Sequence, residues 1–178
     1  MEDPAKEIEQ VILNLTTTAS PEVQKATVEK YYDTDAQFRH PLCTVPPGPN
    51  SREYILRIYQ WYRIMSPRIK LEVRKVTYDD EKKELFCDVV QEFHIRWSPF
   101  RPAPSRLLVH LKLRPSVIEP NRYFISLHED FYHPEDLVAL VFPPLIPIAH
   151  GALKAGTLAS AVNAYVFGLL GRSDFDTK

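Results

Sequence analysis

Three side chains in this sequence have the types and spacing that acid–base chemistry needs. His128 and Asp130 are two residues apart, so on a strand they share one face, and an imidazole beside a carboxylate pairs a proton acceptor with the group that orients it. His40 stands directly before Pro41, where an extended segment stops. Together the three are candidates for proton transfer on a small molecule. The alternatives are that His128 and Asp130 form a surface pair and that His40 bonds its own turn.

Gln91 and a set of aromatic residues indicate where a ligand would lie. Gln91 interrupts an otherwise apolar strand face that runs from Leu85 to Phe93, so its amide needs a ligand or a buried partner such as a helix end or water. Aromatic side chains in nearby segments can line an apolar cavity, although aromatics at helical spacing also serve as ordinary core. We expect ligand contacts from Gln91 and from Tyr32, Phe38, Tyr54, Tyr59, Trp61, Tyr62, Phe93 and Tyr123.

The composition excludes several classes of function. Lys and Arg number 22 and Asp and Glu number 23 in 178 residues, which is not the basic excess of a nucleic-acid-binding domain. Cys43 and Cys87 have neither metal-ligand spacing nor a disulfide framework, and no phosphate loop or nucleophile elbow occurs. We therefore expect no metal, no cofactor and no nucleic acid. The N-terminus lacks the regions of a secretory signal, which predicts a cytoplasmic protein.

The pattern of the apolar residues predicts two helices, a short strand, a third helix and then a run of strands. The short strand is residues 35–40, and Pro41 ends it. Helical spacing and caps indicate helices near residues 5–15, from Ser20 to about Tyr32, and from Ser51 to Pro67. The period then changes to two, which indicates antiparallel strands near residues 71–76, 85–97, 107–114 and 122–132. A sheet with one apolar face needs a cover. We therefore expect an α+β fold in which a curved antiparallel sheet wraps three helices.

The opposite face of the expected sheet is charged. It carries Glu92, His94, Arg96, Arg106, His110 and Lys112. This pattern predicts a cross-strand charge ladder, and the alternative is a surface for a homodimer or another partner.

Several residue runs have specific counterparts in a known family. Residues 35–43, Asp-Ala-Gln-Phe-Arg-His-Pro-Leu-Cys, have the form DAxFxHPxC, and residues 58–62 and Glu129–Asp130 extend the likeness over roughly residues 20–135. These runs resemble the fungal SigF-like branch of the NTF2-like (nuclear transport factor 2-like, SnoaL-like) superfamily. The resemblance implies an NTF2-like cone around an apolar pocket, with His40 at the pocket mouth. Related folds include isomerases, dehydratases, cyclases and noncatalytic carriers, so the fold alone decides no function.

The last part of the chain differs in character from the rest. From residue 137 to residue 171 only Lys154 carries a fixed charge. As a helix, residues 152–170 would extend about 28 Å, close to the ~30 Å hydrocarbon core of a bilayer. We therefore divide the chain into an NTF2-like domain, residues 1–136, and an apolar C-terminal helical segment, residues 137–178.

Three arrangements are open for this segment. We favour contact with a membrane or lipid droplet through residues 137–171; the alternatives are packing on the domain and an oligomer contact. The oligomer contact would use small residues four apart, Gly156, Ser160, Ala164 and Gly168. The loop 97–104 contains Trp, Phe and Arg, which suit a membrane interface, or it is a proline-stiffened connection.

Together these patterns favour a domain that binds a small apolar ligand or lipid without catalysis. We expect it on the cytosolic face of an intracellular membrane or lipid droplet. The first alternative is an isomerase- or dehydratase-type enzyme that uses His40, His128 and Asp130. The second alternative is a dimerisation module that pairs through the charged sheet face.

Overall fold

The computed structural model describes residues 1–169, which form five α-helices, one short 3-10 helix and one six-stranded sheet. The elements are α1 (Pro4–Thr16), α2 (Pro21–Tyr31), β1 (Tyr32–His40), β2 (Cys43–Val45), α3 (Ser51–Met65), β3 (Ile69–Asp79), β4 (Glu84–Phe93), β5 (Pro104–Pro115), β6 (Tyr123–Tyr132), α4 (Pro134–Val141), a short 3-10 helix (Pro143–Leu145) and α5 (Ile146–Leu169). The three expected N-terminal helices are confirmed. The first two begin with a proline behind a capping side chain, Asp3 and Ser20.

The sheet contains one strand more than the sequence pattern predicts, namely β2. The strand order is β2-β1-β6-β5-β4-β3. All neighbours are antiparallel except β1 and β6, which are parallel. The short strand expected over residues 35–40 is β1, which begins earlier, at Tyr32. It sets Phe38 opposite His128. Strand β2, Cys43–Val45, has only three residues and is too short to leave a periodicity to detect.

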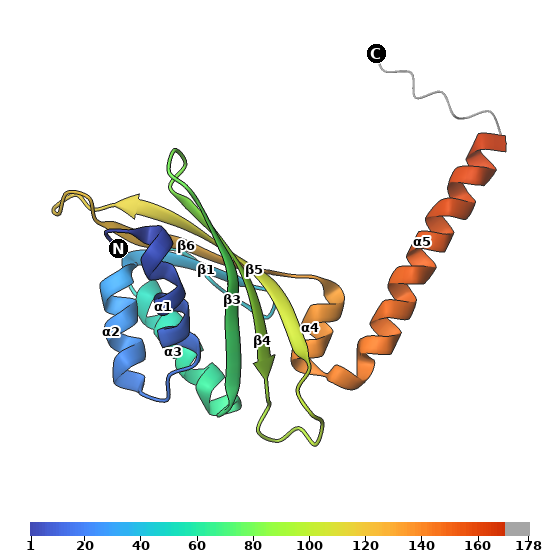
Figure 1. The fold of residues 1–178 in the computed structure, drawn as a ribbon, viewed down its shortest axis with the longest axis horizontal. Coiled ribbons are helices and arrows are strands. Elements are labelled where there is room, and N and C mark those ends of the chain that lie inside the picture. Colours follow the sequence, from blue (N-terminus) through green and yellow to red (C-terminus); the bar gives the residue numbers. More distant parts are fainter. Residues whose placement is uncertain (170–178) are drawn as a thin grey trace, which may run out of the picture.

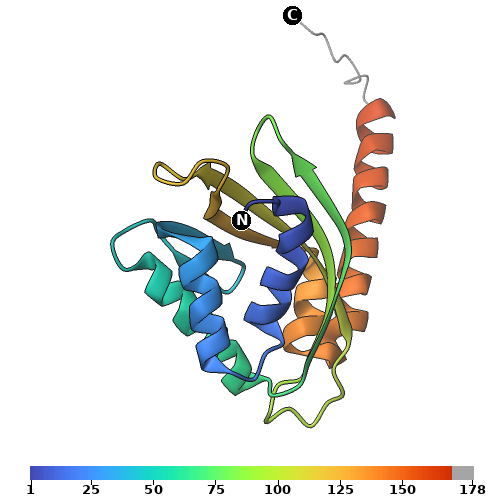
Figure 2. The same cartoon turned by 60° about the vertical axis from the view of Figure 1, so that its left-hand side comes forward.

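The three N-terminal helices cover the concave face of the sheet, as Figures 1 and 2 show. Leu85, Cys87 and Val89 of β4 point into this core and are at most 1% exposed. From α1, Ile8 and Val11 are buried in the same core. Apolar and polar residues alternate along β4 because one face of the strand packs against the helices and the other lies on the outside of the sheet. The α+β architecture with a curved sheet wrapped around three helices is confirmed.

Strand β4 ends at Phe93, and the expected continuation to Trp97 is wrong. Beyond Phe93 the chain leaves its neighbouring strand and bonds the end of α3 instead. The amide of His94 donates to Ser66 Oγ at 3.0 Å, and the amide of Arg96 donates to the carbonyl of Met65 at 2.8 Å. These bonds turn residues 94–104 into a loop at the open end of the cone.

The outer face of the sheet carries the expected charge ladder. Its cross-strand ion pairs include Lys70–Glu92 at 3.0 Å, Asp88–Arg106 at 2.8 Å and Glu84–Lys112 at 3.2 Å. His110 lies between two carboxylates, 3.1 Å from Glu129 and 3.5 Å from Glu84. His94 and Arg96 lie beyond the end of β4 and do not join this ladder. A homodimer through this face stays a prediction.

Helix α4 packs on the domain and closes one side of the cone. Ser105 Oγ donates to the carbonyl of Asp136 at 2.8 Å, and the amide of Arg106 donates to Asp136 Oδ1 at 2.8 Å. These bonds hold α4 against β5, and Ala139 and Leu140 are buried there. The boundary expected after Asp136 therefore falls within α4.

Helix α5 extends away from the domain (Figure 1). Every residue from His150 to Gly168 is exposed. The stretch Pro143–Gly168 is long and apolar enough to cross a bilayer, with a mean hydropathy of 1.3 over its most apolar window and none of that window buried in the protein. By length and composition alone this is weak evidence for a membrane span. The end of the expected lipid-contacting range, residues 170 and 171, lies outside the described residues.

The packing of α4 leads to a prediction about stability. Leu140→Ala is expected to lower the free energy of unfolding by about 2–4 kcal/mol, because it removes buried methyl groups and leaves a void beside the pocket. Leu153→Ala in α5, where Leu153 is 44% exposed, is the matched control and should change stability by less than about 0.5 kcal/mol. Urea unfolding of the full chain measures both. Equal effects of the two substitutions would contradict the packing of α4 described here.

Candidate functional site

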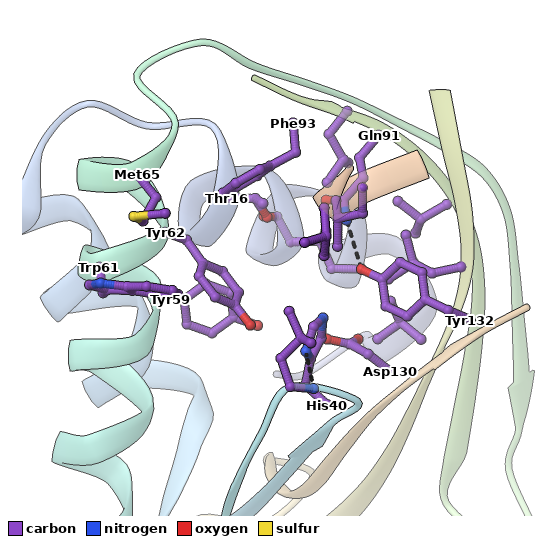
Figure 3. A pocket seen from close by; sticks show the side chains of 18 of the residues that line it. Thr16, His40, Tyr59, Trp61, Tyr62, Met65, Gln91, Phe93, Asp130 and Tyr132 are labelled. Carbon is purple, nitrogen blue, oxygen red and sulfur yellow. Dashed lines mark hydrogen bonds between the residues drawn. The ribbon is translucent and has the colours of Figure 1, made fainter. Parts of the chain in front are cut away.

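A pocket opens between the concave face of the sheet, α1, α3 and α4 (Figure 3). Its volume is about 150 Å³, which is the size of a cavity that accepts a single aromatic ring. The aliphatic part of its lining comprises Ile12, Leu42, Met65, Leu71, Val89, Ile95, Leu107, Val109, Leu140 and Val141. A few polar side chains interrupt this lining, as is usual for sites that bind small molecules.

His128 and Asp130 lie on the inward face of β6 and both line the pocket. Their side chains are 4% and 9% exposed, so they form a buried pair and not a surface pair. Nε2 of His128 lies 3.0 Å from Oδ1 of Asp130, and Nδ1 lies 2.7 Å from the hydroxyl of Tyr32. Three side chains from two parallel strands therefore form one hydrogen-bonded chain that ends at the pocket.

The chemistry of the partners assigns the protons in this chain. An ionised carboxylate only accepts hydrogen bonds, so His128 donates from Nε2–H to Asp130. In the neutral imidazole Nδ1 is then an acceptor, and the Tyr32 hydroxyl donates to it. Burial raises the pKa of Tyr32 far above the usual range, which keeps the phenol protonated for this role. The result is a carboxylate whose Oδ1 is fixed and whose orientation is set.

His40, at the end of β1, faces the same pocket. Its Nδ1 accepts a hydrogen bond from the amide of Leu42 at 3.1 Å, so the expected bond to its own turn is present. Burial lowers the pKa of His40, and the charge of Asp130 partly opposes this effect. His40 is therefore a neutral imidazole with its proton on Nε2. Within residues 1–169 no protein group bonds that Nε2–H, which leaves it available to a bound molecule.

Gln91 finds a partner inside the pocket. Its Nε2 donates to the hydroxyl of Tyr132 at 2.7 Å, as Figure 3 shows. Because Tyr132 accepts this bond, its own O–H remains a donor. Burial, with a smaller contribution from Asp130, raises the pKa of Tyr132 well above its ordinary value, so the phenol stays protonated. Gln91, the polar residue on the apolar face of β4, thus positions the Tyr132 hydroxyl as a second hydrogen-bond donor near Asp130.

The structure brings most of the expected aromatic residues to this site. Tyr59, Trp61, Tyr62 and Phe93 line the pocket. Tyr32 and Phe38 lie behind the lining, where both are at most 1% exposed. Tyr32 bonds His128, and the ring of Phe38 lies 5.1 Å from the His128 ring. These two residues support the site without forming its wall.

Two expected contacts are not part of the pocket. Tyr54 is 58% exposed and borders a separate groove on the outer side of α3, because it lies on the opposite helix face from Tyr59. Tyr123 begins β6 at the far end of the strand, where its amide bonds the carbonyl of Met1. Tyr132, by contrast, was missed by the sequence reasoning, although it continues the alternation of His128 and Asp130.

The described part of the chain contains no metal-binding arrangement. Among residues 1–169 no three His, Cys, Asp or Glu side chains converge closely enough to hold an ion.

Solved structures of the same fold share little sequence with this chain. A hypothetical protein with a ketosteroid isomerase-like fold from Catenulispora acidiphila, in complex with trimethylamine, is 15% identical with a TM-score of 0.55, covering 74% of this chain and 91% of that one. An NTF2-like protein from Anabaena variabilis is 13% identical with a TM-score of 0.54, covering 74% and 90%. The epoxide hydrolase/cyclase-like enzyme SalBIII, in pyran ring formation in salinomycin, is 16% identical with a TM-score of 0.52, covering 76% and 97%. Together they define an NTF2-like fold.

The sequence adds a narrower assignment to this fold class. It matches the family of the SigF NTF2-like domain over residues 1–172. The chain belongs to this family. No curated protein matches the sequence.

The buried His40 leads to a prediction about pH. Its lowered pKa means that, below the unfolded value of about 6.5, the unfolded chain binds a proton that the folded chain does not. The contribution of neutral His40 to the free energy of unfolding is therefore fully present above pH ~6.5. It is lost as the pH falls toward the pKa of His40 in the folded chain, by at most about 1.4 kcal/mol per pH unit. His40→Asn, which keeps an acceptor near the Nδ1 position, should flatten this part of the profile.

Urea unfolding of the wild type and of His40→Asn at neutral and mildly acidic pH measures this effect. The difference in unfolding free energy between the two pH values should be smaller in the variant. An identical pH dependence in both proteins would show that His40 titrates alike in the folded and unfolded chains.

Proposed function

We propose that the protein is an acid–base catalyst of the isomerase, dehydratase or cyclase kind, acting on a small apolar molecule that bears a carbonyl or hydroxyl group. The observation that carries this proposal is the carboxylate of Asp130 inside an apolar pocket, with Oδ1 bonded to His128. Within residues 1–169 no hydrogen bond from the protein reaches Oδ2 of Asp130, so this oxygen is free to take a proton from a bound molecule.

The surrounding groups have distinct roles in this scheme. His128, held by Tyr32, orients the carboxylate and does not itself touch the substrate's reacting proton. His40 and Tyr132 present Nε2–H and O–H groups, which stabilise negative charge as it develops on a substrate oxygen. Removal of a proton by Asp130 and its return at another atom would isomerise the substrate or eliminate water from it.

Binding without chemistry, which the sequence alone favours, explains this geometry less well. A carboxylate is costly to bury in an apolar cavity unless it is paired and hydrogen-bonded. A carrier of apolar molecules gains nothing from such a group, whereas a catalyst of proton transfer requires it. Ligand binding in the pocket remains the first step of the proposed reaction, and the volume of about 150 Å³ favours substrates near the size of one ring.

Names among the structural relatives agree with this class of reaction. One relative has a ketosteroid isomerase-like fold, and SalBIII is an epoxide hydrolase/cyclase-like enzyme. At 15% and 16% identity they support the fold and no particular substrate. The expected fungal origin of the chain stays a prediction.

Proton exchange tests this proposal without knowledge of the natural substrate. In D₂O, the full chain should accelerate hydrogen–deuterium exchange next to the carbonyl of small cyclic ketones, followed by NMR. Asp130→Asn should reduce the acceleration by about 10²–10⁴-fold, because the amide cannot take the proton. Asp80→Asn, in the exposed turn after β3, is the matched control and should retain full activity. Equal rates for Asp130→Asn and the wild type would refute the assignment.

We also propose that α5 holds the domain at a membrane or lipid-droplet surface on the cytosolic side. The helix is apolar on all sides and exposed along its length from His150 to Gly168. A helix that is apolar all round is ordinarily buried in protein or in lipid, and the described domain does not bury it. Lys154 is its one fixed charge among the described residues.

Flotation with vesicles tests the role of α5. The full chain should float with phosphatidylcholine vesicles, and Leu158→Lys with Val162→Lys should reduce the floating fraction at least about tenfold, because each Lys near a helix centre opposes insertion by ~2.5–3.5 kcal/mol. The matched control is Val117→Lys with Ile118→Lys, two residues that are 99% and 90% exposed in the β5–β6 loop. Loss of flotation in both double variants would exclude a specific role for α5.

A further inference from the structure

The end of the cone near α4 has a continuous exposed apolar edge. Two segments form it, the β4–β5 loop (residues 94–104) and the junction between α4 and α5 (residues 141–148), which lie at the same end of the molecule in Figures 1 and 2. The rings of Phe100 and Phe142 meet edge to face with centroids 5.1 Å apart and join the two segments. We call this surface the rim; its exposed apolar side chains are Trp97, Phe100, Val141, Phe142, Leu145 and Ile148.

The rim borders the mouth of the pocket. Ile95, two residues before Trp97, lines the pocket, and so does Val141, directly before Phe142. Val141 is itself 42% exposed, so one side chain belongs both to the pocket wall and to the outer surface. A molecule that covers the rim therefore lies directly against the route into the pocket.

The charges carried by the rim's own two segments are all positive. The loop 94–104 contains Arg96 and Arg101 and no acidic residue. Both arginines are exposed, and within residues 1–169 neither forms an ion pair. Arg39, Arg106 and Arg114, on the outer sheet face, are each paired with a carboxylate. Unpaired arginines beside exposed Trp and Phe complement anionic lipid headgroups above an apolar interior.

We propose that the rim docks on an anionic bilayer, so that the pocket opens onto lipid and takes its substrate from the membrane. The proposal rests on the membrane role proposed for α5, because α5 begins within the rim, at Ile146. Trp97, Phe100 and Ile148 enter the headgroup–acyl boundary, and Arg96 and Arg101 contact anionic headgroups. The substrate class is then a lipid-soluble molecule, which agrees with the apolar lining and with a size near one ring.

The other end of the sheet supplies a natural contrast. Val117 and Ile118 in the β5–β6 loop are 99% and 90% exposed, but hairpin geometry places them at the opposite end of β5 from the rim. The β5–β6 loop therefore exposes apolar side chains at a place far from the pocket. A probe at this end reports whether lipid contact is specific to the rim.

Fluorescence quenching in vesicles tests the docking of the rim. The chain has two tryptophans, so Trp61→Phe leaves Trp97 as the single reporter in the full chain. With vesicles of brominated phosphatidylcholine and a minor fraction of phosphatidylserine, Trp97 emission should fall at least about twofold, as for interfacial tryptophan. The control carries Val117→Trp with both native tryptophans replaced by Phe, and its emission should be unchanged.

The outcomes separate the two membrane proposals. If the protein floats with the vesicles but Trp97 is quenched no more than Trp at position 117, the rim proposal is overturned and the role of α5 stands. If the protein does not float, both are overturned. Arg96→Glu with Arg101→Glu should reduce Trp97 quenching in vesicles that contain phosphatidylserine and leave it unchanged in pure phosphatidylcholine. Equal loss in both vesicle types would overturn the assignment of anionic lipid.

Discussion

The site depends on holding one carboxylate in a fixed orientation inside an apolar cavity. Asp130 is nine-tenths buried, and its Oδ1 accepts from His128, which is in turn held by Tyr32. Without this support, a buried carboxylate would rotate, take up a proton or bring in water. With it, Oδ2 is held toward the pocket. The proposed chemistry depends on this one interaction.

The topology explains how the interaction is built. Parallel pairing of β1 with β6 sets Tyr32 opposite Ile125, from where its hydroxyl reaches Nδ1 of His128 at 2.7 Å. The helices on the concave face exclude water from the pair, and α4 adds Leu140 and Val141 to the pocket wall. The chain then passes directly from that wall into the rim and α5, so the proposed active site and the proposed membrane contact share one segment.

The sequence predicts part of this arrangement, and the reasons for the rest are physical. Alternation shows that His128 and Asp130 share a face, but both faces of β6 mix polar and apolar residues, so the pattern does not identify the inner one. The role of Tyr32 comes from a pairing between distant segments, which local periodicity does not report. Tyr54 and Tyr59 differ only in the helix face they occupy, and a list of aromatic residues does not separate them. The helices and the alternation of β4 depend on local patterns, and these were predicted correctly.

Histidine ¹⁵N NMR of the full chain tests the central claim most directly. At neutral pH the His128 ring is expected as a single neutral tautomer with its proton on Nε2 and a bare Nδ1, because Asp130 accepts from the first nitrogen and Tyr32 donates to the second. Tyr32→Phe should shift the Nδ1 resonance and leave the Nε2–H in place. An Nε2 without a proton, or an average of both tautomers, would contradict a carboxylate held by His128.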